Sequence, residues 1–505
     1  MSGGNTLITS FFQKVPKTES DKSTEFISQM LKKKEDIQKK LDTQSKSLIK
    51  DDKDKYSLEQ SSARLIKQQL TPSQVVAFDL VCSGENVFIT GSAGTGKSFL
   101  INTIKQWANK NEKKIAITAL TGAAAALIEG KTIHSWAAVG LGKDTAEDYA
   151  RYIHNKMPLK MRWFKTQILI IDEVSMMNSR FLDMIEELAR LVRKNVKPFG
   201  GIQVILCGDF FQLPPVQKTF KRNDDGEEVE DSYFCFEAGC WNRLINYTVE
   251  LKEIMRQKDI EFAECLQKVR QGIVDDKVHE IINKCLSSQD SKKEMIKLIK
   301  PTRLYTTRAS VDEINYKELR KLQNKGNEVI NYKASVGTTK KCSAEDVDRY
   351  MQMMDRDHPY QVDLHLAKDA QVMLLANLGT EEGLVNGSRG VIIGFDNNYP
   401  MVQFMNGMVL KIIEHEWKME ATSNITIIRR QIPLKLAWAI TVHKSQGASL
   451  DCVELDIGSS IFEYGQTYVA LSRVRSMEGL SIISFNPKKV MAHPRVKDFY
   501  ETISS

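Results

Sequence analysis

The sequence predicts an α/β fold with two parallel β-sheets and a small all-β insert. Between residues 63 and 250, short apolar segments such as "NVFITG", "ILIIDE" and "IQVILCGD" alternate with helical stretches. This alternation is typical of β–α units that build a parallel sheet covered by helices on both faces. The pattern returns with "RLYTT", "CVELDIG" and "GLSIISF", so we expect a second sheet domain from residues 251–334 and 426–505.

The segment between the two parts of the second domain has a different pattern. Residues 335–425 contain short apolar runs, among them "AQVMLLANL" and "GSRGVIIGF", that are joined by Gly and Asn turns. Strands of this length with such turns are typical of small antiparallel barrels. We therefore predict a small β-barrel domain inserted into the second sheet domain.

The N-terminal residues lack the composition of a folded domain. Residues 13–60 are rich in Lys, Asp, Glu, Ser and Gln and contain no glycine, so they cannot bury enough apolar surface to fold alone. We predict a disordered tail over 1–62. Residues 1–25 contain neither arginine nor an apolar segment, which argues against a secretory or mitochondrial leader.

The totals for the chain of 505 residues are those of a soluble protein with several domains. No apolar run reaches the length that would cross a membrane. The net charge of +7 permits a polyanionic partner without requiring one. The eight scattered cysteines are typical of reduced thiols, and Cys235 and Cys240 lack the further ligands that a zinc site needs.

A glycine-rich segment after the first predicted strand has the pattern of a phosphate-binding loop. "GSAGTGKS" (91–98) matches G-x-x-x-x-G-K-[ST] and stands between the strand "NVFIT" and a helix, which is the context that this loop needs. Backbone N–H groups of such a loop bind the phosphates of ATP. Lys97 is expected to meet the β- and γ-phosphates, and Ser98 to hold Mg²⁺. The predicted ATP-binding residues of the loop are Gly91, Ser92, Ala93, Gly94, Thr95, Gly96, Lys97 and Ser98.

An acid pair ends another apolar strand. In "ILIIDEVSMM" (168–177), four apolar residues run into Asp172 and Glu173. Ligands of open α/β sheets bind outside the carboxyl ends of the strands. Asp172 therefore suits the Mg²⁺ shell, and Glu173 suits a general base for water. The alternative is an exposed acid pair without function, which is common after a strand.

A third strand end carries a glutamine between aromatic and proline residues. "GDFFQLPPV" (208–216) follows the apolar strand "IQVILC", so Gln212 is expected near the γ-phosphate on the same sheet edge. Pro214 and Pro215 stiffen the loop that carries it. The alternative is a rigid turn with a surface glutamine.

Arginines of the second sheet domain are further candidates. Arg256 follows the strand "YTVEL", and Arg473 and Arg475 stand before the final strand. Guanidinium groups supplied by a neighbouring domain stabilise the transition state of phosphoryl transfer. Each arginine taken alone would more often be an ordinary surface charge.

The order of these segments resembles the motifs of superfamily 1B helicases. "LTPSQ", "GSAGTGKS", "TGAAAALIEGKTIHSW", "IIDEVSM", "GDFFQLPP", "EIMRQ", "ITVHKSQG" and "YVALSRVR" follow one another between residues 66 and 490. "RLVRKNVKPFGGIQVILCGDFFQLPPV" is similar to the signature of the petite integration frequency (PIF) DNA helicases, which are relatives of RecD. The resemblance implies that the two sheet domains are RecA-like motor domains that bind ATP and Mg²⁺ between them. It also implies a small wedge insertion at about 138–163.

The same resemblance implies an ATP-driven DNA helicase that moves 5′ to 3′ along single-stranded DNA. Gln74 matches a residue that reads the adenine, and Gln446 matches one that faces the nucleotide. Arg256 and Arg473 match residues that reach the γ-phosphate from the second motor domain. The sequence departs from the family pattern at Arg475, where many relatives carry an uncharged residue.

Two further motifs imply contacts with DNA. Thr121, His134 and Trp136 match segments that touch DNA, and His443 and Lys444 match a segment that couples DNA to ATP. Trp136 is expected to stack on a base, a contact that tolerates any sequence, and a core tryptophan is the alternative. The expected partners are single-stranded and forked DNA, and the protein is expected to act as a monomer.

A short segment of the tail resembles the box that docks on the sliding clamp, proliferating cell nuclear antigen (PCNA). In "NTLITSFF" (5–12), Ile8 is the aliphatic residue, Phe11 and Phe12 are the paired aromatic residues, and Asn5 stands where the pattern has Gln. One helical turn would bring the apolar side chains together as anchors in a groove. Docking implies a nuclear protein, with a mitochondrial or viral replication compartment as the alternative. A terminus that adheres without a specific partner is the alternative to docking.

Two other functions compete with the DNA helicase. An RNA helicase of the neighbouring superfamily 1 branch would share the ATP-binding motifs, but the PIF-like signature argues against it. A clamp-bound scaffold with a decayed ATPase would have no reason to keep the full catalytic set. That set is Lys97, Glu173, Gln212, Arg256 and Arg473. The sequence therefore favours a DNA helicase acting in replication, repair, recombination or telomere maintenance.

Overall fold

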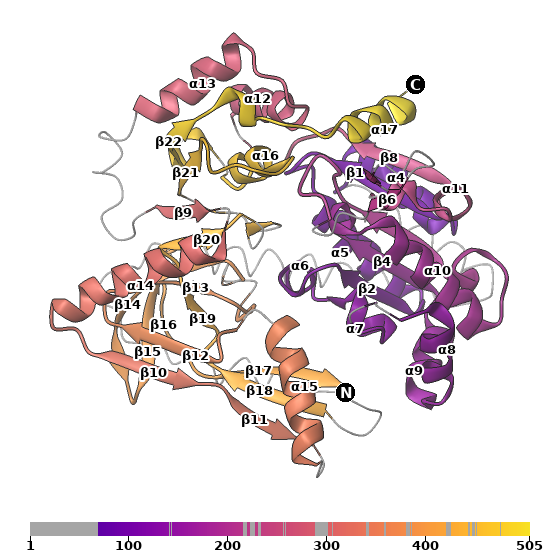
Figure 1. Ribbon diagram of the computed structural model, residues 1–505, viewed down its shortest axis with the longest axis horizontal. Helices are drawn as coiled ribbons and strands as arrows, with labels where there is room; N and C mark the ends of the chain where they lie inside the picture. The colour runs from indigo at the N-terminus through magenta and orange to yellow at the C-terminus, as the bar shows by residue number, and fades with distance from the viewer. Residues whose placement is uncertain are drawn as a thin grey trace, which may run out of the picture.

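The computed structural model describes residues 69–504 apart from short gaps. The gaps are residues 141, 143, 216–219, 223–227, 231–233, 256, 258, 288–300, 306, 340–342, 358–359, 380–383, 385, 421–425, 443–444, 447–449, 451 and 475. The predicted tail over 1–62 therefore lies outside the described residues. Figure 1 shows two α/β lobes, with a β-rich domain beside the second lobe.

The first lobe is built on a six-stranded parallel sheet with the strand order β3-β2-β4-β5-β1-β8. Its strands are β1 (Val87–Gly91), β2 (Ile115–Ala119), β3 (Lys131–Thr132), β4 (Ile168–Asp172), β5 (Gln203–Cys207) and β8 (Tyr247–Leu251). Every residue of β1 and β4 is buried, as expected of central strands covered on both faces. Ile89 pairs with Cys207 and Ile171 with Leu206, so the carboxyl ends of β1, β4 and β5 meet at one edge.

Helices cover the sheet of the first lobe. They are α4 (Pro72–Cys82), α5 (Lys97–Lys110), α6 (Gly122–Leu127), α7 (Ile133–Ala137), α8 (Ala146–His154), α9 (Met157–Lys165), α10 (Ser179–Arg193) and α11 (Trp241–Leu244), with the short helices η1 (Val174–Met176), η2 (Pro198–Gly201) and η3 (Cys235–Glu237). Between β5 and η3 the chain also forms an antiparallel hairpin of β6 (Phe220–Arg222) and β7 (Glu228–Glu230). α10 buries Ile185, Leu188 and Val192 along one face, which is the spacing of an amphipathic helix. Asn178 begins it, because its side chain accepts from the N–H of Phe181 at 2.8 Å.

The helices α8 and α9 form an extension of the first lobe, in the region where the family resemblance implied a wedge at about 138–163 (Figure 1). The last carbonyls of a helix have no partner within it. Arg193, at the end of α10, donates from Nη1 to the carbonyls of Trp163, Phe164 and Thr166 at the end of α9. The guanidinium therefore ties the base of the extension to the first lobe.

The second lobe has a four-stranded parallel sheet with the order β20-β9-β21-β22. Its elements are α12 (Ile260–Arg270), α13 (Asp276–Ser287), β9 (Thr302–Tyr305), α14 (Arg308–Asn324), β20 (Ala439–Thr441), β21 (Val453–Ile457), α16 (Gln466–Leu471), η6 (Met477–Gly479), β22 (Leu480–Phe485) and η7 (Pro487–Lys489). Ala93 and Leu213 of the first lobe pack into the apolar core of this lobe, so the two lobes touch beside the phosphate-binding loop. Among the described helices, none combines the length and the hydropathy needed to span a membrane.

A β-rich domain interrupts the second lobe. Its strands pair in three antiparallel sheets with the orders β16-β15-β14-β13-β19, β11-β18-β17 and β10-β12. The elements are β10 (Val329–Lys333), β11 (Ser335–Thr338), α15 (Ala344–Asp357), β12 (Asp363–Ala367), β13 (Gln371–Leu374), β14 (Arg389–Asp396), β15 (Tyr399–Phe404), β16 (Val409–Lys411), β17 (His415–Glu420), β18 (Thr426–Gln431) and β19 (Leu434–Leu436). The domain is wider than the expected 335–425, because its first and last strands lie outside that range.

The C-terminal helix returns to the first lobe. α17 (Pro494–Ser504) was expected to belong to the second lobe, within 426–505, but Val496 and Tyr500 are buried in the core of the first lobe. Phe499 stacks on Phe236 with ring centroids 4.3 Å apart. Figure 1 shows the yellow helix against the indigo and magenta elements of the first lobe. The chain therefore crosses between the lobes once more than its sequence pattern indicates.

Candidate nucleotide site between the two lobes

The glycine-rich turn joins the end of β1 to the start of α5. Gly91, Gly94 and Gly96 have φ angles of 143°, 92° and 81°, a region that side chains disfavour. A Cβ on Gly91 would lie 2.7 Å from the carbonyl oxygen of Leu251, and one on Gly96 would lie 2.5 Å from Nε2 of Gln74. The glycines therefore allow a tight turn that leads into the N-terminus of α5.

Lys97 is the first residue of α5, and its ammonium group lies inside the turn. Nζ donates to the carbonyl oxygens of Gly91 at 2.6 Å and Ser92 at 3.0 Å. Burial lowers the pKa of Lys97, against the opposing charges of Asp209 and Glu173. Ser98 follows with an exposed side chain. The predicted phosphate-binding residues are thus gathered in one turn.

Gln74 lies against the same turn. Pro72 starts α4, and the side chain of Gln74 is fully buried. Its Oε1 accepts from the N–H of Thr71 at 3.1 Å, and its Nε2 donates to the carbonyl of Thr95 at 3.0 Å. These contacts hold the predicted adenine-reading residue at the edge of the glycine-rich turn.

Asp172 and Glu173 stand at the end of β4, on the sheet edge that carries the turn. Burial, together with the charge of Glu173, raises the pKa of Asp172 to about 7. Glu173 has a φ angle of 56°, and its N–H donates to Oδ1 of Asp172 at 2.9 Å. Among the described residues no group of three or more His, Cys, Asp or Glu side chains could hold a metal ion.

Two glutamines meet this edge from different parts of the chain. Gln446 of the second lobe donates from Nε2 to Oε2 of Glu173 at 2.9 Å. The Oε1 atoms of Gln446 and Gln212 are both buried, and neither has a hydrogen-bond partner among the residues that the structure describes. A buried acceptor without a donor is costly. The site therefore offers two acceptor atoms that a bound molecule or water could satisfy.

Arg473 is buried in the second lobe close to the same segment. Its Nε donates to the carbonyl of Val469 at 2.8 Å, and its Nη1 to that of Ser445 at 3.2 Å. Ser445 directly precedes Gln446, so the arginine lies beside the segment that reaches Glu173. Arg256 and Arg475 lie outside the described residues.

Of the predicted DNA-contact residues, the structure describes Thr121, His134 and Trp136. Trp136 is 5% exposed, and its ring lies 4.5 Å from that of Trp163, so its ring is covered in this structure, which fits the core alternative. His134 is partly exposed and stacks on Phe181 at 4.5 Å. Thr121 accepts from the N–H of Ala124 at the start of α6. His443 and Lys444 lie outside the described residues.

Sequence reasoning missed a group of residues that joins the lobes beside this site. Asp209 accepts from Nη2 of Arg270 in α12 at 3.0 Å and from the hydroxyl of Tyr468 in α16 at 3.2 Å. Asp209 stands in the segment that was singled out for Gln212, but no motif marks its partners. One feature of the sequence pointed to Arg270. It lies four positions after Leu266 and next to Val269, so the helical spacing of α12 places it on the buried face.

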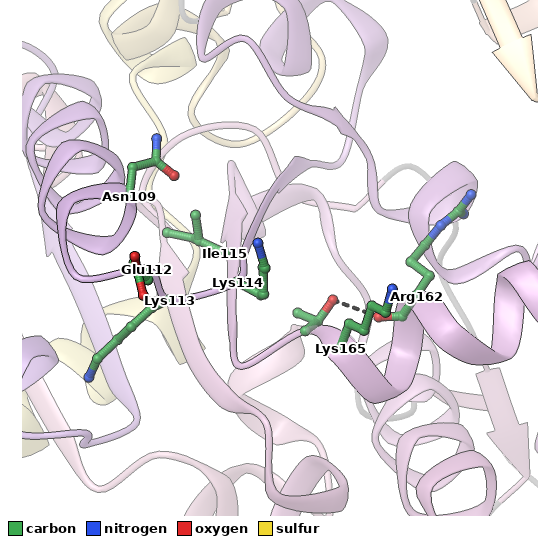
Figure 2. A pocket seen from close by; sticks show the side chains of 8 residues that line it. Asn109, Glu112, Lys113, Lys114, Ile115, Arg162 and Lys165 are labelled. Atoms are coloured by element: carbon green, nitrogen blue, oxygen red, sulfur yellow. Dashed lines mark hydrogen bonds between the residues drawn. The ribbon is translucent and has the colours of Figure 1, made fainter. Parts of the chain in front are cut away.

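A separate cavity of about 330 Å³ lies at the opposite edge of the first sheet (Figure 2). It is lined by Asn109, Glu112, Lys113, Lys114, Ile115, Arg162, Lys165 and Thr166. Ile115 begins β2, and the strands are parallel, so this basic cavity is at the amino ends of the strands. It is not part of the site at their carboxyl ends.

Comparisons with known proteins cover both the first lobe and the insert. The model of the PIF1-like helicase family matches residues 68–280, and that of the 2B domain of DNA helicase Pif1 matches residues 354–395. The ATP-dependent DNA helicase PIF1 of Danio rerio is 40% identical over 442 residues, which are 87% of this chain and 64% of that protein. The chain thus spans slightly less than two thirds of the length of this curated relative.

Solved structures share the fold over most of the chain. The crystal structure of Pif1 helicase from Candida albicans is 35% identical, with a TM-score of 0.70 over 86% of this chain and 99% of that one. Pif1 helicase from Bacteroides in complex with ADP-AlF3 and ssDNA is 29% identical, with a TM-score of 0.60 over 86% and 97% of the two chains. The resemblance seen in the sequence motifs is confirmed, and the chain belongs to the PIF1-like helicase family.

Proposed function

We propose that the protein is an ATP-dependent DNA helicase that moves 5′ to 3′ on single-stranded DNA and unwinds duplex or structured DNA. The observation that carries the proposal is the hydrogen bond between Gln446 of the second lobe and Glu173 beside the phosphate-binding turn. It places a segment of one lobe on the acid of the other, as a nucleotide site shared by two motor domains requires. The relatives support it, since the Danio rerio protein is an ATP-dependent DNA helicase and the Bacteroides protein was crystallised with ADP-AlF3 and ssDNA.

The phosphates of ATP are proposed to bind at the turn between β1 and α5. The first N–H groups of α5 have no partner within the helix, and the helix dipole favours an anion there. Lys97 would exchange the carbonyls of Gly91 and Ser92 for phosphate oxygens. Gln74 is proposed to face the adenine, because its amide is held at the edge of the turn.

The residues present fit a magnesium ion that binds together with ATP. The raised pKa of Asp172 results from burial and from the neighbouring charge of Glu173, and a cation would favour the ionised carboxylate. Mg²⁺ commonly takes one or two protein ligands and completes its shell with phosphate and water, so Ser98 and Asp172 are sufficient. When bound, the ion neutralises charge on the phosphate oxygens.

Hydrolysis needs a base for the attacking water and positive charge for the phosphate. Glu173 is proposed to accept the proton of the water, while Gln446 holds one oxygen of its carboxylate in place. The Oε1 of Gln212, which has no hydrogen-bond partner within the described part of the chain, can accept the other proton of the same water and so orient it. Arg473, with Arg256, is proposed to reach the γ-phosphate from the second lobe when the lobes close.

Movement along DNA would follow from this shared site. Because both lobes contact the nucleotide, binding and hydrolysis change the free energy of the closed arrangement relative to the open one. Thr121 and His134 of the first lobe and His443 and Lys444 of the second are proposed to bind the DNA strand. Trp136 is left out of this set because it is buried.

The first experiment measures ATP turnover with and without single-stranded DNA. We expect strong stimulation by DNA, and near-complete loss of turnover in Lys97→Ala. Lys105→Ala is the matched control, since Lys105 lies on the same helix and pairs with Glu129 at 2.6 Å. Equal turnover with and without DNA would contradict the helicase proposal, and stronger stimulation by RNA would favour the RNA helicase alternative. Strand displacement on forks with a 5′ or a 3′ overhang then tests the polarity.

The tail is proposed to dock on the sliding clamp PCNA through residues 5–12, which lie outside the described residues. The support is the spacing of Ile8, Phe11 and Phe12 in a segment with no core near it in the sequence. Joint replacement of both phenylalanines by alanine should remove clamp binding and leave ATP turnover intact. Unchanged clamp affinity would reject the docking. A nuclear location, at replication forks, is proposed on the same ground.

A further inference from the structure

A buried ion pair joins the two lobes beside the phosphate-binding turn. Asp209, two residues after β5, is 0% exposed and accepts from Nε and Nη2 of Arg270 at 3.1 Å and 3.0 Å. The guanidinium lies 4.7 Å from the ring of Phe211 and 5.0 Å from that of Tyr500. Burial would lower the pKa of Arg270, but the charge of Asp209 raises it above its usual value. The guanidinium therefore stays charged, and breaking its contact with Asp209 would leave a buried charge alone.

The hydroxyl of Tyr468 connects this carboxylate with the turn itself. Tyr468, on α16, donates to Oδ2 of Asp209 at 3.2 Å and accepts from the N–H of Ala93 at 2.7 Å. Gln267, on α12, donates to Oγ of Ser92 at 2.7 Å. Figure 1 shows α12 and α16 on the side of the second lobe that faces the first. The second lobe thus holds two successive residues of the turn that receives the phosphates.

The helix that carries Tyr468 also reaches two other parts of the site. Gly465 precedes α16, and a Cβ there would lie 2.5 Å from the carbonyl oxygen of Gln212, so the start of the helix rests on the loop of that glutamine. Arg473 follows the end of α16 and bonds back to a carbonyl within it. The short helix α16 therefore connects the contact at the turn with Arg473.

We propose that Tyr468 is a positioning residue that couples the state of the phosphate-binding turn to the angle between the lobes, and thereby to the binding of single-stranded DNA. The proposal rests on the proposed helicase function and assigns a role to a residue that takes no direct part in ATP hydrolysis. When phosphates enter the turn, the hydrogen bond between Ala93 and the tyrosine changes. The change passes to α16, while Asp209 and Arg270 remain the fixed contact about which the helix moves.

The test measures the linkage between nucleotide and DNA in the full chain. The dissociation constant of a labelled oligothymidylate is measured without nucleotide and with saturating ADP and aluminium fluoride. The ratio of the two constants is the coupling factor, which by linkage is the same whichever ligand binds first. The variants are Tyr468→Phe and, as matched control, Tyr360→Phe. Tyr360 is also buried and donates to a carboxylate, Asp355, at 2.7 Å, but it lies in the β-rich domain.

We expect the wild type and Tyr360→Phe to share a coupling factor of about fivefold or more, the lower end of common allosteric effects. Tyr468→Phe should bring the factor within about twofold of one, while its thermal unfolding remains a single cooperative transition. A wild-type factor in Tyr468→Phe would overturn the proposal. A factor of one in the wild type would instead overturn the helicase function on which it rests.

A second variant covers the case in which Tyr468→Phe does not fold. Gln267→Leu removes the neighbouring contact with Ser92 from a half-buried position and leaves the buried ion pair intact. We expect its coupling factor to differ from that of the wild type by at least about threefold, in the direction of one, a change within the usual range of coupling effects. An unchanged factor in this folded variant would reject the role of the contact between the second lobe and the turn.

Discussion

Gln446 and Glu173 are hydrogen-bonded across the lobes at 2.9 Å, although 273 positions separate them in the sequence. The glutamine follows β20 of the second lobe, and the glutamate follows β4 of the first. A proton-accepting carboxylate must point at its water, and only a contact from the opposite lobe makes that orientation depend on whether the lobes are closed. The contact therefore links the chemistry of one lobe to the position of the other.

Replacing Gln446 by alanine should lower the DNA-stimulated kcat for ATP by about 10- to 100-fold, at most the lower end of the roughly 10²- to 10⁴-fold that a general base contributes, because Glu173 itself remains. The KM for ATP should change less, because the phosphate contacts remain. Steady-state kinetics with saturating DNA measure both constants. Gln403→Ala, at a half-buried position of β15 in the β-rich domain, is the control, and equal kcat values in the two variants would exclude a role for Gln446.

Asp172 should make the nucleotide-free protein less stable as the pH rises. Burial raises its pKa from 3.8 to about 7, so ionising it costs more in the folded than in the unfolded state. The cost is absent below pH 3.8, grows towards pH 7 and stays constant above it. Asp172→Asn should therefore raise the free energy of unfolding at pH 8 by on the order of 2 kcal/mol, with a smaller gain at pH 5.

Urea unfolding with a chelator and without nucleotide measures this difference at the two pH values. The same variant should have lost ATP turnover, because the proposed magnesium ligand is gone. A gain in stability that is equal at pH 5 and pH 8 would show that the carboxylate does not titrate with a raised pKa. A loss of stability at pH 8 would show that its charge is favourable in the folded protein.

The part of the site that could be predicted from sequence is the part built from strand ends. Apolar strands that run into "GSAGTGKS", Asp172 and "GDFFQ" mark one edge of a parallel sheet, because the carboxyl ends of parallel strands lie together. Each of these segments is local, so its residues and their order are sufficient to identify it. The parallel sheets and the β-rich insert follow from patterns of the same kind.

Contacts between distant elements could not be predicted in this way. The pairing of Asp209 with Arg270 depends on how the two lobes meet, and no pattern within α12 specifies that. The apolar face of α17 shows that the helix packs on something, but not that Tyr500 enters the core of the first lobe. Trp136 presents the same problem, since its motif fits both a ring for DNA bases and a core residue.

Trp136 is expected to act through stability and not through stacking on DNA. Its ring is buried against Trp163, so Trp136→Ala should lower the free energy of unfolding by about 3–5 kcal/mol. Trp136→Leu keeps an apolar side chain that cannot stack, and its affinity for single-stranded DNA should remain within about twofold of the wild type. Fluorescence anisotropy checks this. A loss of about 1–3 kcal/mol in binding, the usual contribution of base stacking, would restore the DNA-binding role.

Arg193 is expected to stabilise the attachment of the α8–α9 extension to the rest of the first lobe. Its guanidinium donates to the carbonyl of Gly200 at 2.7 Å and to three carbonyls at the end of α9. Hydrogen bonds to a charged group contribute about 1.5–3 kcal/mol, so Arg193→Ala should lower the free energy of unfolding by about that amount. Arg193→Lys should recover less than about half of it, because an ammonium group lacks the planar fork of the guanidinium.

Urea unfolding and hydrogen exchange in α9 measure the two effects of this substitution. Faster exchange should be confined to α9 and the neighbouring η2, because the lost donors lie between these two elements. Arg151→Ala is the matched control, since Arg151 lies exposed on α8 and pairs only with the nearby Asp148 among the described residues. Such a surface pair contributes at most about 1 kcal/mol. If Arg193→Ala were no less stable than Arg151→Ala, the carbonyls at the end of α9 would be satisfied by water, and the arginine would not hold the extension.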